Sequence, residues 1–185
     1  MNPNRILVLF AHATPHLSRV NRRLAEAARL VEGVYLHDLY ENYPDFYIDP
    51  AREHALLAQA GTVVFLFPLQ WYSMPALLKE WIDVVLRDAW SGPPRKSGRR
   101  FWLATSTGAG SDDFAPGARQ GRAFADFLAP FEQIAAACGM QWLEPLVLHG
   151  AHDVNAATVD AHIARFTTRL RQLADHPLTL GADGT

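Results

Sequence analysis

Short apolar runs alternate along the chain with longer segments in which apolar residues recur every three or four positions. The short runs predict β-strands at residues 5–10, 34–39, 62–67, 101–106 and 142–148. The longer segments predict helices at residues 18–31, 50–60, 75–87, 121–138 and 155–174. Strands that alternate with helices are typical of an α/β domain in which helices cover both faces of a parallel sheet.

The polarity of each run also predicts where its strand lies in the sheet. The first, third and fourth runs are mostly apolar, as expected for central strands that are buried on both faces. The second run contains His37 and Asp38, and the fifth contains Pro145, which cannot donate to a sheet ladder. The sequence therefore predicts a doubly wound, five-stranded parallel sheet of order 2-1-3-4-5. Ligands of such sheets bind beyond the carboxyl ends of the strands, beside the switch between the first and third strands.

Three residues predict details of the helices. Pro130 lacks an amide proton and is expected to kink or split the fourth helix. Gly139 is placed to end that helix, and Asn155 is placed to cap the first amides of the last helix.

Composition narrows the class of protein. With 185 residues, of which 49% are apolar and 19% charged, the chain fits one packed domain over residues 1–175, followed by a loose tail at 176–185. A formal net charge of −2 without any block of Lys or Arg argues against nucleic acid as a partner. The first apolar run is too short for a signal peptide or a membrane span, so we expect a cytoplasmic protein. Cys138 is the single cysteine, which excludes an intrachain disulfide, and we expect it to be a small core residue.

The loop after the first strand contains residues suited to hold a phosphate. Ser18 is predicted to open the first helix, whose N-terminal amides carry a partial positive charge and attract anions. His12, Arg19 and Asn21 add side chains that can donate to a terminal phosphate. The alternatives are that Ser18 simply caps the helix and that His12 is an ordinary loop histidine. No GxxxxGK[ST] or GxGxxG motif occurs, which argues against a P-loop NTPase and a Rossmann dehydrogenase.

The loop after the third strand, residues 68–75, places Trp71 and Tyr72 between two prolines. Exposure of either ring to water forgoes roughly 1.5–3 kcal/mol, so both are expected to cover a ligand, for which a flavin ring is suitable. The alternative is that both rings pack into the core or into a subunit interface. Their position at the carboxyl end of a central strand favours the ligand.

The loop after the fourth strand is built from small residues, among them Ser106, Thr107, Gly108 and Ala109. Their backbone amides can approach the edge of a ring without obstruction, although a loop of this composition is also an ordinary turn. Because the carboxyl ends of neighbouring parallel strands meet at one edge of the sheet, the three loops are expected to converge on a single flavin that carries a phosphate.

Other candidates are weaker. His149 and His152 follow the last strand, where solvated loop histidines are favoured over a substrate pocket. The acidic pair at 112–113 is expected to be solvated rather than to act as acid and base. The aromatic residues of segment 43–47 fit a dimer interface and core packing equally well.

The motifs that carry a family resemblance are residues 11–12 with 18–21, Tyr43-Pro-Asp-Phe46, Pro68-Leu-Gln-Trp-Tyr-Ser-Met-Pro75, Leu78-Lys-Glu-Trp-Ile-Asp83 and residues 105–110. In these stretches the chain resembles the NAD(P)H:quinone oxidoreductases of flavodoxin-like fold. It is most similar to the ancillary proteins of glutathione-regulated potassium-efflux systems. The resemblance covers residues 5–175, and the Gln-Trp-Tyr-Ser-x-Pro loop is its most specific part.

The resemblance implies a flavodoxin-like fold that binds FMN, with FAD less expected. The phosphate is implied to lie near His12, Ser18, Arg19, Val20 and Asn21. The ring is implied to lie against Pro68, Leu69, Gln70, Trp71, Tyr72, Ser106, Thr107, Gly108 and Ala109. The resemblance also implies a homodimer, NAD(P)H as co-substrate and a small-molecule quinone as acceptor. A further implied partner is a potassium-efflux antiporter at the inner face of the cell membrane.

One departure from the family concerns the loop after the fourth strand. Diaphorase-type relatives carry a Tyr and a His there, whereas residues 106–121 contain neither. The reaction implied is therefore a two-electron, ping-pong hydride transfer through flavin N5 without a catalytic side chain. The alternatives are a non-catalytic FMN-binding regulator of potassium efflux and an FMN reductase that acts on azo or nitro aromatics. A one-electron carrier is disfavoured because the strongly acidic face expected of it is absent.

Overall fold

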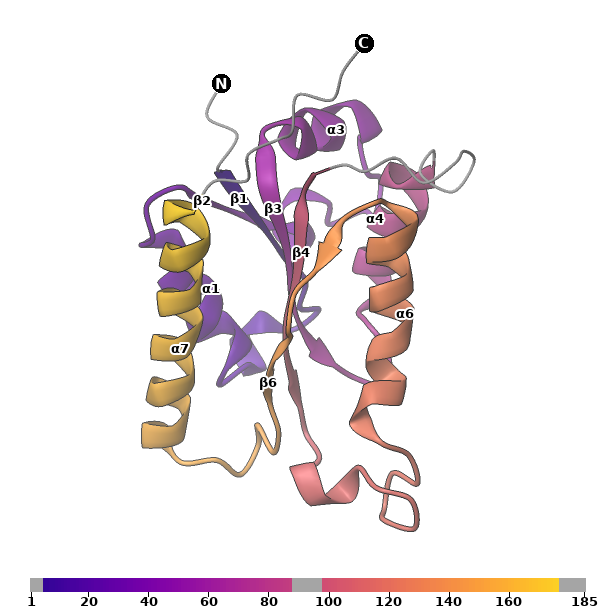
Figure 1. Ribbon diagram of the computed structural model, residues 1–185, viewed down its shortest axis with the longest axis vertical. Helices are drawn as coiled ribbons and strands as arrows, with labels where there is room; N and C mark the ends of the chain where they lie inside the picture. The colour runs from indigo at the N-terminus through magenta and orange to yellow at the C-terminus, as the bar shows by residue number, and fades with distance from the viewer. Residues whose placement is uncertain (1–4, 88–97, 177–185) are drawn as a thin grey trace.

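The computed structural model describes residues 5–87 and 98–176, which form a parallel sheet with helices on both faces (Figure 1). The strand order is β2-β1-β3-β4-β5, and β6 pairs with β4 beyond β5. The strands are β1 Arg5–Phe10, β2 Val34–Asp38, β3 Ala60–Leu69, β4 Arg100–Thr107, β5 Gln141–Trp142 and β6 Leu146–Leu148. This arrangement confirms the α/β fold class, the strand order and the edge positions predicted for the second and fifth strands.

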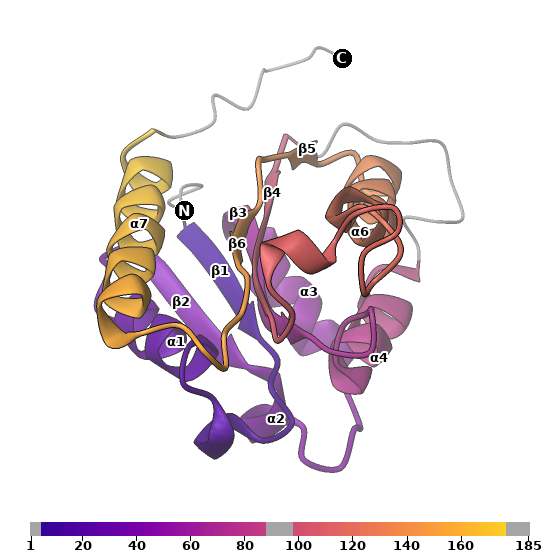
Figure 2. The ribbon, with the colours of Figure 1, turned by 90° about the horizontal axis from the view of Figure 1, so that it is seen from below.

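The helices divide between the two faces of the sheet. Helices α1 Asn21–Arg29 and α7 Ala156–Asp175 lie on one side, and α4 Ala76–Val85 and α6 Phe124–Ala137 lie on the other (Figures 1 and 2). The second face is completed by α3 Pro50–Ala58 and by the short α2 Leu39–Asn42. Along β1, Leu7 and Leu9 join the core under α3, α4 and α6, whereas Ile6 and Val8 join the core under α1 and α7. A strand with two buried faces is apolar throughout for this reason.

The first helix begins later than predicted. Residues Pro15–Leu17 form a 3-10 turn, and Ser18 follows it in an extended conformation, so that α1 starts at Asn21 with Val20 as its N-cap. The Ser18 hydroxyl oxygen still accepts a hydrogen bond from the amide of Arg22, at 3.3 Å. The prediction that Ser18 opens the helix is therefore wrong, because the turn at Pro15 places Ser18 outside it.

The predicted fifth strand is divided into β5 and β6. Arg100 and Phe101 of β4 pair with β5, and the ladder resumes between Ala104 and β6. Pro145 lies in the interruption, where its missing N–H cannot complete a ladder. The indole N–H of Trp102 donates to the Glu144 carbonyl at 3.0 Å and thereby occupies one acceptor in the gap.

Helix α6 contains Pro130 and is not split. Its end confirms the prediction for Gly139, which has a φ of 62° and donates to Ala136, while Met140 donates to Ala135. Asn155 caps α7 as predicted, because its side-chain oxygen accepts the amide of Thr158 at 2.8 Å. A short helix missed by the sequence, α2, begins where Asp38 accepts the amides of Tyr40 and Glu41.

Within residues 5–87 and 98–176, no helix has both the length and the apolar character needed to cross a membrane. Most of the predicted tail, residues 177–185, lies outside the described residues.

Candidate functional site

Loops from four neighbouring parallel strands meet at the carboxyl edge of the sheet, the end seen in Figure 2. Phe10 at the end of β1 is in register with Leu66 of β3, and Leu69 at the end of β3 is in register with Thr107 of β4. The three loops predicted to bind a ligand therefore start side by side.

His12 lies in the loop after β1, and its imidazole is buried. Its Nδ1 accepts the amide of Thr14 at 3.2 Å, so the neutral ring carries its proton on Nε2. Burial, followed by the nearby His16, lowers the pKa of His12 below its ordinary value. At neutral pH the side chain is thus a neutral donor at Nε2.

The N-terminus of α1 offers backbone donors. Among the described residues, the amides of Arg19, Val20 and Asn21 have no acceptor. The Val20 side chain is buried in the core, so only its backbone faces the loop. The Arg19 guanidinium is held nearby, because its Nη1 donates to the carbonyl of His152 at 2.9 Å. Free amides at a helix N-terminus beside a cation form an anion site.

Asn21 joins the first and third of these loops. Its side-chain Nδ2 donates to the hydroxyl oxygen of Ser106 at 2.8 Å, and both residues are buried. The Oδ1 atom of Asn21 is also buried and has no hydrogen-bond partner among the described residues. Buried polar atoms are nearly always paired, so this unpaired acceptor fits a ligand that brings a hydroxyl or amide proton.

Trp71 and Tyr72 form a two-residue turn, closed by reciprocal backbone hydrogen bonds between Gln70 and Ser73. Both central residues are left-handed, with φ of 50° and 66°, a conformation that favours Gly and Asn. Trp71 is 93% exposed and Tyr72 is 57% exposed, although Tyr72 stacks on Phe127. The alternative that both rings pack into the core is therefore wrong. Strain and apolar exposure together are typical of a functional site.

A cavity of about 180 Å³ lies between this turn and the loop after β4. Its walls are Leu69, Trp71, Tyr72, Thr107, Gly108, Ala109, Phe114 and Gln120. Pro68, buried near the end of β3, and Gln70, exposed in the turn, are not part of these walls but adjoin Leu69, which is. Among the described residues, the amides of Gly108 and Ala109 have no acceptor and remain available to a ligand.

The sequence missed several residues here. Phe114 and Gln120 line the cavity although they lie in a loop without a motif, and Phe127 supports Tyr72 from α6. His149, expected to be solvated, is half-buried and contacts the rings of Phe114 and Phe124. These contacts join segments far apart in sequence, so no local pattern indicates them.

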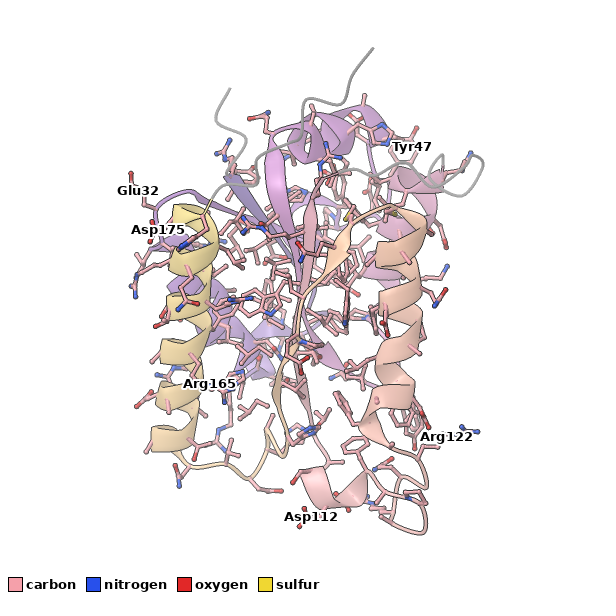
Figure 3. The ribbon with its side chains drawn as sticks, viewed as in Figure 1. Glu32, Tyr47, Asp112, Arg122, Arg165 and Asp175 are labelled. Atoms are coloured by element: carbon pink, nitrogen blue, oxygen red, sulfur yellow. The ribbon has the colours of Figure 1, made fainter. Side chains whose placement is uncertain are left out.

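The remaining candidates do not line this cavity. Asp113 accepts the amide of Gly110 at 2.9 Å, while Asp112 lies at the outer end of the loop (Figure 3). Tyr47 is 82% exposed and lies at the opposite end of the molecule (Figure 3). Tyr43 is buried, which favours core packing for that part of the segment. Among the described residues, no group of three His, Cys, Asp or Glu side chains is arranged to hold a metal ion.

Comparison with known proteins agrees with this architecture. The sequence matches the flavodoxin-like fold family over residues 4–173. The structure of general stress protein 14 from Treponema denticola, in complex with FMN, is 30% identical and superposes with a TM-score of 0.82 over 91% of this chain and 99% of that one. A thermophilic tryptophan halogenase from Streptomycin violaceusniger is 32% identical, with a TM-score of 0.78 over 96% and 99% of the two chains. An NADPH-quinone reductase from P. pentosaceus shares the fold at 24% identity, with a TM-score of 0.79 over 90% and 97%. The chain belongs to the flavodoxin-like fold family.

Proposed function

We propose that this chain is an FMN-dependent NAD(P)H oxidoreductase that reduces quinones. The observation that carries the proposal is the buried Asn21–Ser106 hydrogen bond, which joins an anion site at α1 to the end of β4, where the next residue, Thr107, lines the cavity beside Trp71 and Tyr72. A ligand with a phosphate at one end and a flat ring at the other fits that arrangement. The FMN bound by the Treponema denticola protein, at 30% identity, supports this choice of ligand.

The phosphate end is assigned to the helix terminus. The free amides of residues 19–21 donate to phosphate oxygens, and the Nε2 proton of His12 adds a neutral donor. Arg19 contributes the positive charge, and its hydrogen bond to His152 restricts the guanidinium before any ligand arrives. Preorganised donors bind an anion at a lower entropic cost.

The ring end is assigned to the cavity. The chemistry that bound FMN supplies is acceptance of a hydride from NAD(P)H and transfer of two electrons to a quinone. The free amides of Gly108 and Ala109 donate to the ring edge where negative charge develops. Trp71 and Tyr72 form an apolar wall against which planar substrates stack in turn.

The proposal is tested by titrating the purified protein with FMN and then mixing the complex with NADPH and a short-chain quinone. We expect flavin fluorescence quenching, rapid bleaching by NADPH and catalytic turnover. Asn21→Ala removes the bridge and should weaken FMN binding about tenfold, the value of one hydrogen bond near 1.4 kcal/mol. Gln59→Ala is the matched control, because it removes an amide side chain that hydrogen-bonds Arg5 at the opposite, amino-terminal edge of the sheet. A wild-type protein that does not bind FMN contradicts the proposal.

A second function is favoured by the absence of Tyr and His from residues 106–121. In this alternative, the chain binds FMN as a regulator of a potassium-efflux antiporter and does not turn over. Slow bleaching by NADPH in the rapid-mixing experiment would favour it. Reduction of azo or nitro aromatics instead of quinones is distinguished by the acceptor used. The homodimer and the antiporter partner stay predictions.

A further inference from the structure

We propose that residues 149–152, the first part of the loop between β6 and α7, orient the amide edge of the cofactor site, and that His149 is a positioning residue in this loop. The identity of the ligand rests on the proposed function, but the arrangement does not. The loop makes backbone, side-chain and packing contacts with the loop after β4, and each restricts a different part of it.

The backbone contacts fix the direction of one free amide. Ala151 donates its amide to the Thr107 carbonyl at 2.8 Å, so that carbonyl points toward β6. In a planar trans peptide the C=O and the following N–H point in opposite directions. The Gly108 N–H therefore points away from β6 and toward the end of β3, where Leu69 lines the cavity.

The next peptide is held in the same way. The Ala109 carbonyl accepts both the amide of Gly150 at 2.8 Å and the hydroxyl of Thr107 at 2.7 Å. Because the single hydroxyl proton of Thr107 is used there, the 2.9 Å contact between Thr107 Oγ1 and His149 Nδ1 places the proton on Nδ1. His149 thus donates to Thr107 and fixes the direction in which Thr107 donates.

The imidazole of His149 is itself immobilised by packing. Its centroid lies 4.7 Å from the Phe124 ring in an edge-on arrangement and 5.3 Å from the Phe114 ring. Burial lowers the pKa of His149, in agreement with a neutral ring. A neutral ring held on two sides provides a hydrogen bond of constant direction.

His152 connects this edge to the phosphate end. A Cβ at Gly108 would approach the His152 ring to 2.9 Å, so a larger residue there would require this exposed imidazole to move. The backbone carbonyl of the same His152 accepts from Arg19. One loop therefore sets the spacing between the proposed phosphate anchor and the proposed ring edge.

The test compares His149→Ala, His149→Asn and His54→Ala. Asn can present an amide donor near the position of Nδ1, and His54 is a matched control because it donates to the Val85 carbonyl elsewhere in the fold. The ratio of affinities for reduced and oxidised FMN is obtained from the flavin reduction potential. We expect His149→Ala to lower this ratio about tenfold, His149→Asn to restore most of it, and His54→Ala to leave it unchanged.

A second measurement needs no flavin. In the apo-protein, hydrogen exchange at the amides of Gly150 and Ala151 should accelerate at least tenfold in His149→Ala and stay near wild type in His149→Asn. Unchanged exchange and an unchanged affinity ratio in His149→Ala would overturn the proposal. If wild-type protein does not bind FMN, the proposed function fails while the exchange experiment still decides the role of His149.

Discussion

Two polar clusters differ in how completely their groups are paired. Glu53 of α3 is fully buried, and its two carboxylate oxygens accept from His37, Tyr43 and Trp81. In the loops at the carboxyl edge of the sheet, by contrast, the Gly108 amide and the Asn21 Oδ1 atom have no partner among the described residues. The comparison shows that buried polarity alone does not mark a binding site. Groups left without partners, on several converging loops, do.

The Glu53 cluster, made of Glu53 with His37, Tyr43 and Trp81, connects three elements of the fold. It joins β2, the segment after α2, and α4 through one carboxylate. Burial raises the pKa of Glu53, but the hydrogen bonds from His37, Tyr43 and Trp81 outweigh burial and lower the pKa below its ordinary value. Burial, followed by the same carboxylate, raises the pKa of Tyr43. The charge is thus compensated inside the fold, without a ligand.

The largest effect is expected from Glu53→Ala. Its loss leaves three buried donors without an acceptor and should lower the free energy of unfolding by about 3–5 kcal/mol, measured by urea denaturation. Glu80→Ala, on the exposed side of α4, is the matched control and should change stability by less than about 0.5 kcal/mol. The comparison breaks down if Glu53→Ala stays fully folded yet no longer binds FMN.

His162 of α7 sharpens the comparison because it is unpaired but distant from the loops. It is buried in the apolar core, and its Nε2 has no partner in the part of the chain that the structure describes. Burial, followed by Arg165, lowers its pKa to about 4. The unfolded chain takes up this proton below about pH 6.5, whereas the folded chain resists protonation until about pH 4. The free energy of unfolding therefore decreases as the pH falls from about 6.5 to about 4.

We expect this one histidine to reduce the free energy of unfolding by about 2 kcal/mol between pH 7 and pH 5. Urea denaturation of the wild type and of His162→Leu at both pH values gives, for each protein, the change in the free energy of unfolding between pH 7 and pH 5. The difference between these two changes measures the contribution of His162. If that change is the same in the wild type and in His162→Leu, the low pKa assigned to His162 is contradicted. An unpaired titratable group that is enclosed by apolar side chains thus lowers stability at acidic pH and does not indicate a binding site.

The sequence predicted the sheet well because burial on two faces is visible in each strand. The mostly apolar runs that became β1, β3 and β4, and the polar or proline-containing runs that became the edges, needed no knowledge of distant contacts. The predicted start of α1 was wrong because a local turn at Pro15 competes with the helix. Pro145 interrupts the fifth strand and divides it into β5 and β6. From the sequence, Pro145 was interpreted only as a sign that this strand lies at an edge.

The site was predicted less completely. Position at the ends of central strands sufficed to bring Trp71, Tyr72 and Thr107 to one cavity. It did not suffice for His149, whose hydrogen bond to Thr107 spans 42 positions and leaves no local pattern. Nor does composition reveal that two bulky residues occupy left-handed positions, since the turn is imposed by the Gln70–Ser73 pairing.

The smallest expected effect on stability, and the one of opposite sign, comes from Trp71→Asn. The indole is 93% exposed and contributes little packing, whereas its φ of 50° suits Asn better than Trp. We expect the free energy of unfolding to rise by about 0.5–1 kcal/mol, because left-handed strain of about 1 kcal/mol per residue is relieved. The same change removes the apolar wall and should weaken FMN binding about tenfold, the loss of one aromatic contact near 1.4 kcal/mol.

Tyr47→Asn is the control that separates these two effects of Trp71→Asn, higher stability and weaker FMN binding, from a general effect of losing an exposed aromatic ring. Tyr47 is 82% exposed, lies at the opposite end of the molecule (Figure 3), and is not among the left-handed residues. It should therefore change neither stability nor FMN affinity beyond experimental error. If Trp71→Asn instead destabilises the protein, the turn is held by contacts of the indole. Strain at Trp71 would then be no sign of a site maintained for a ligand.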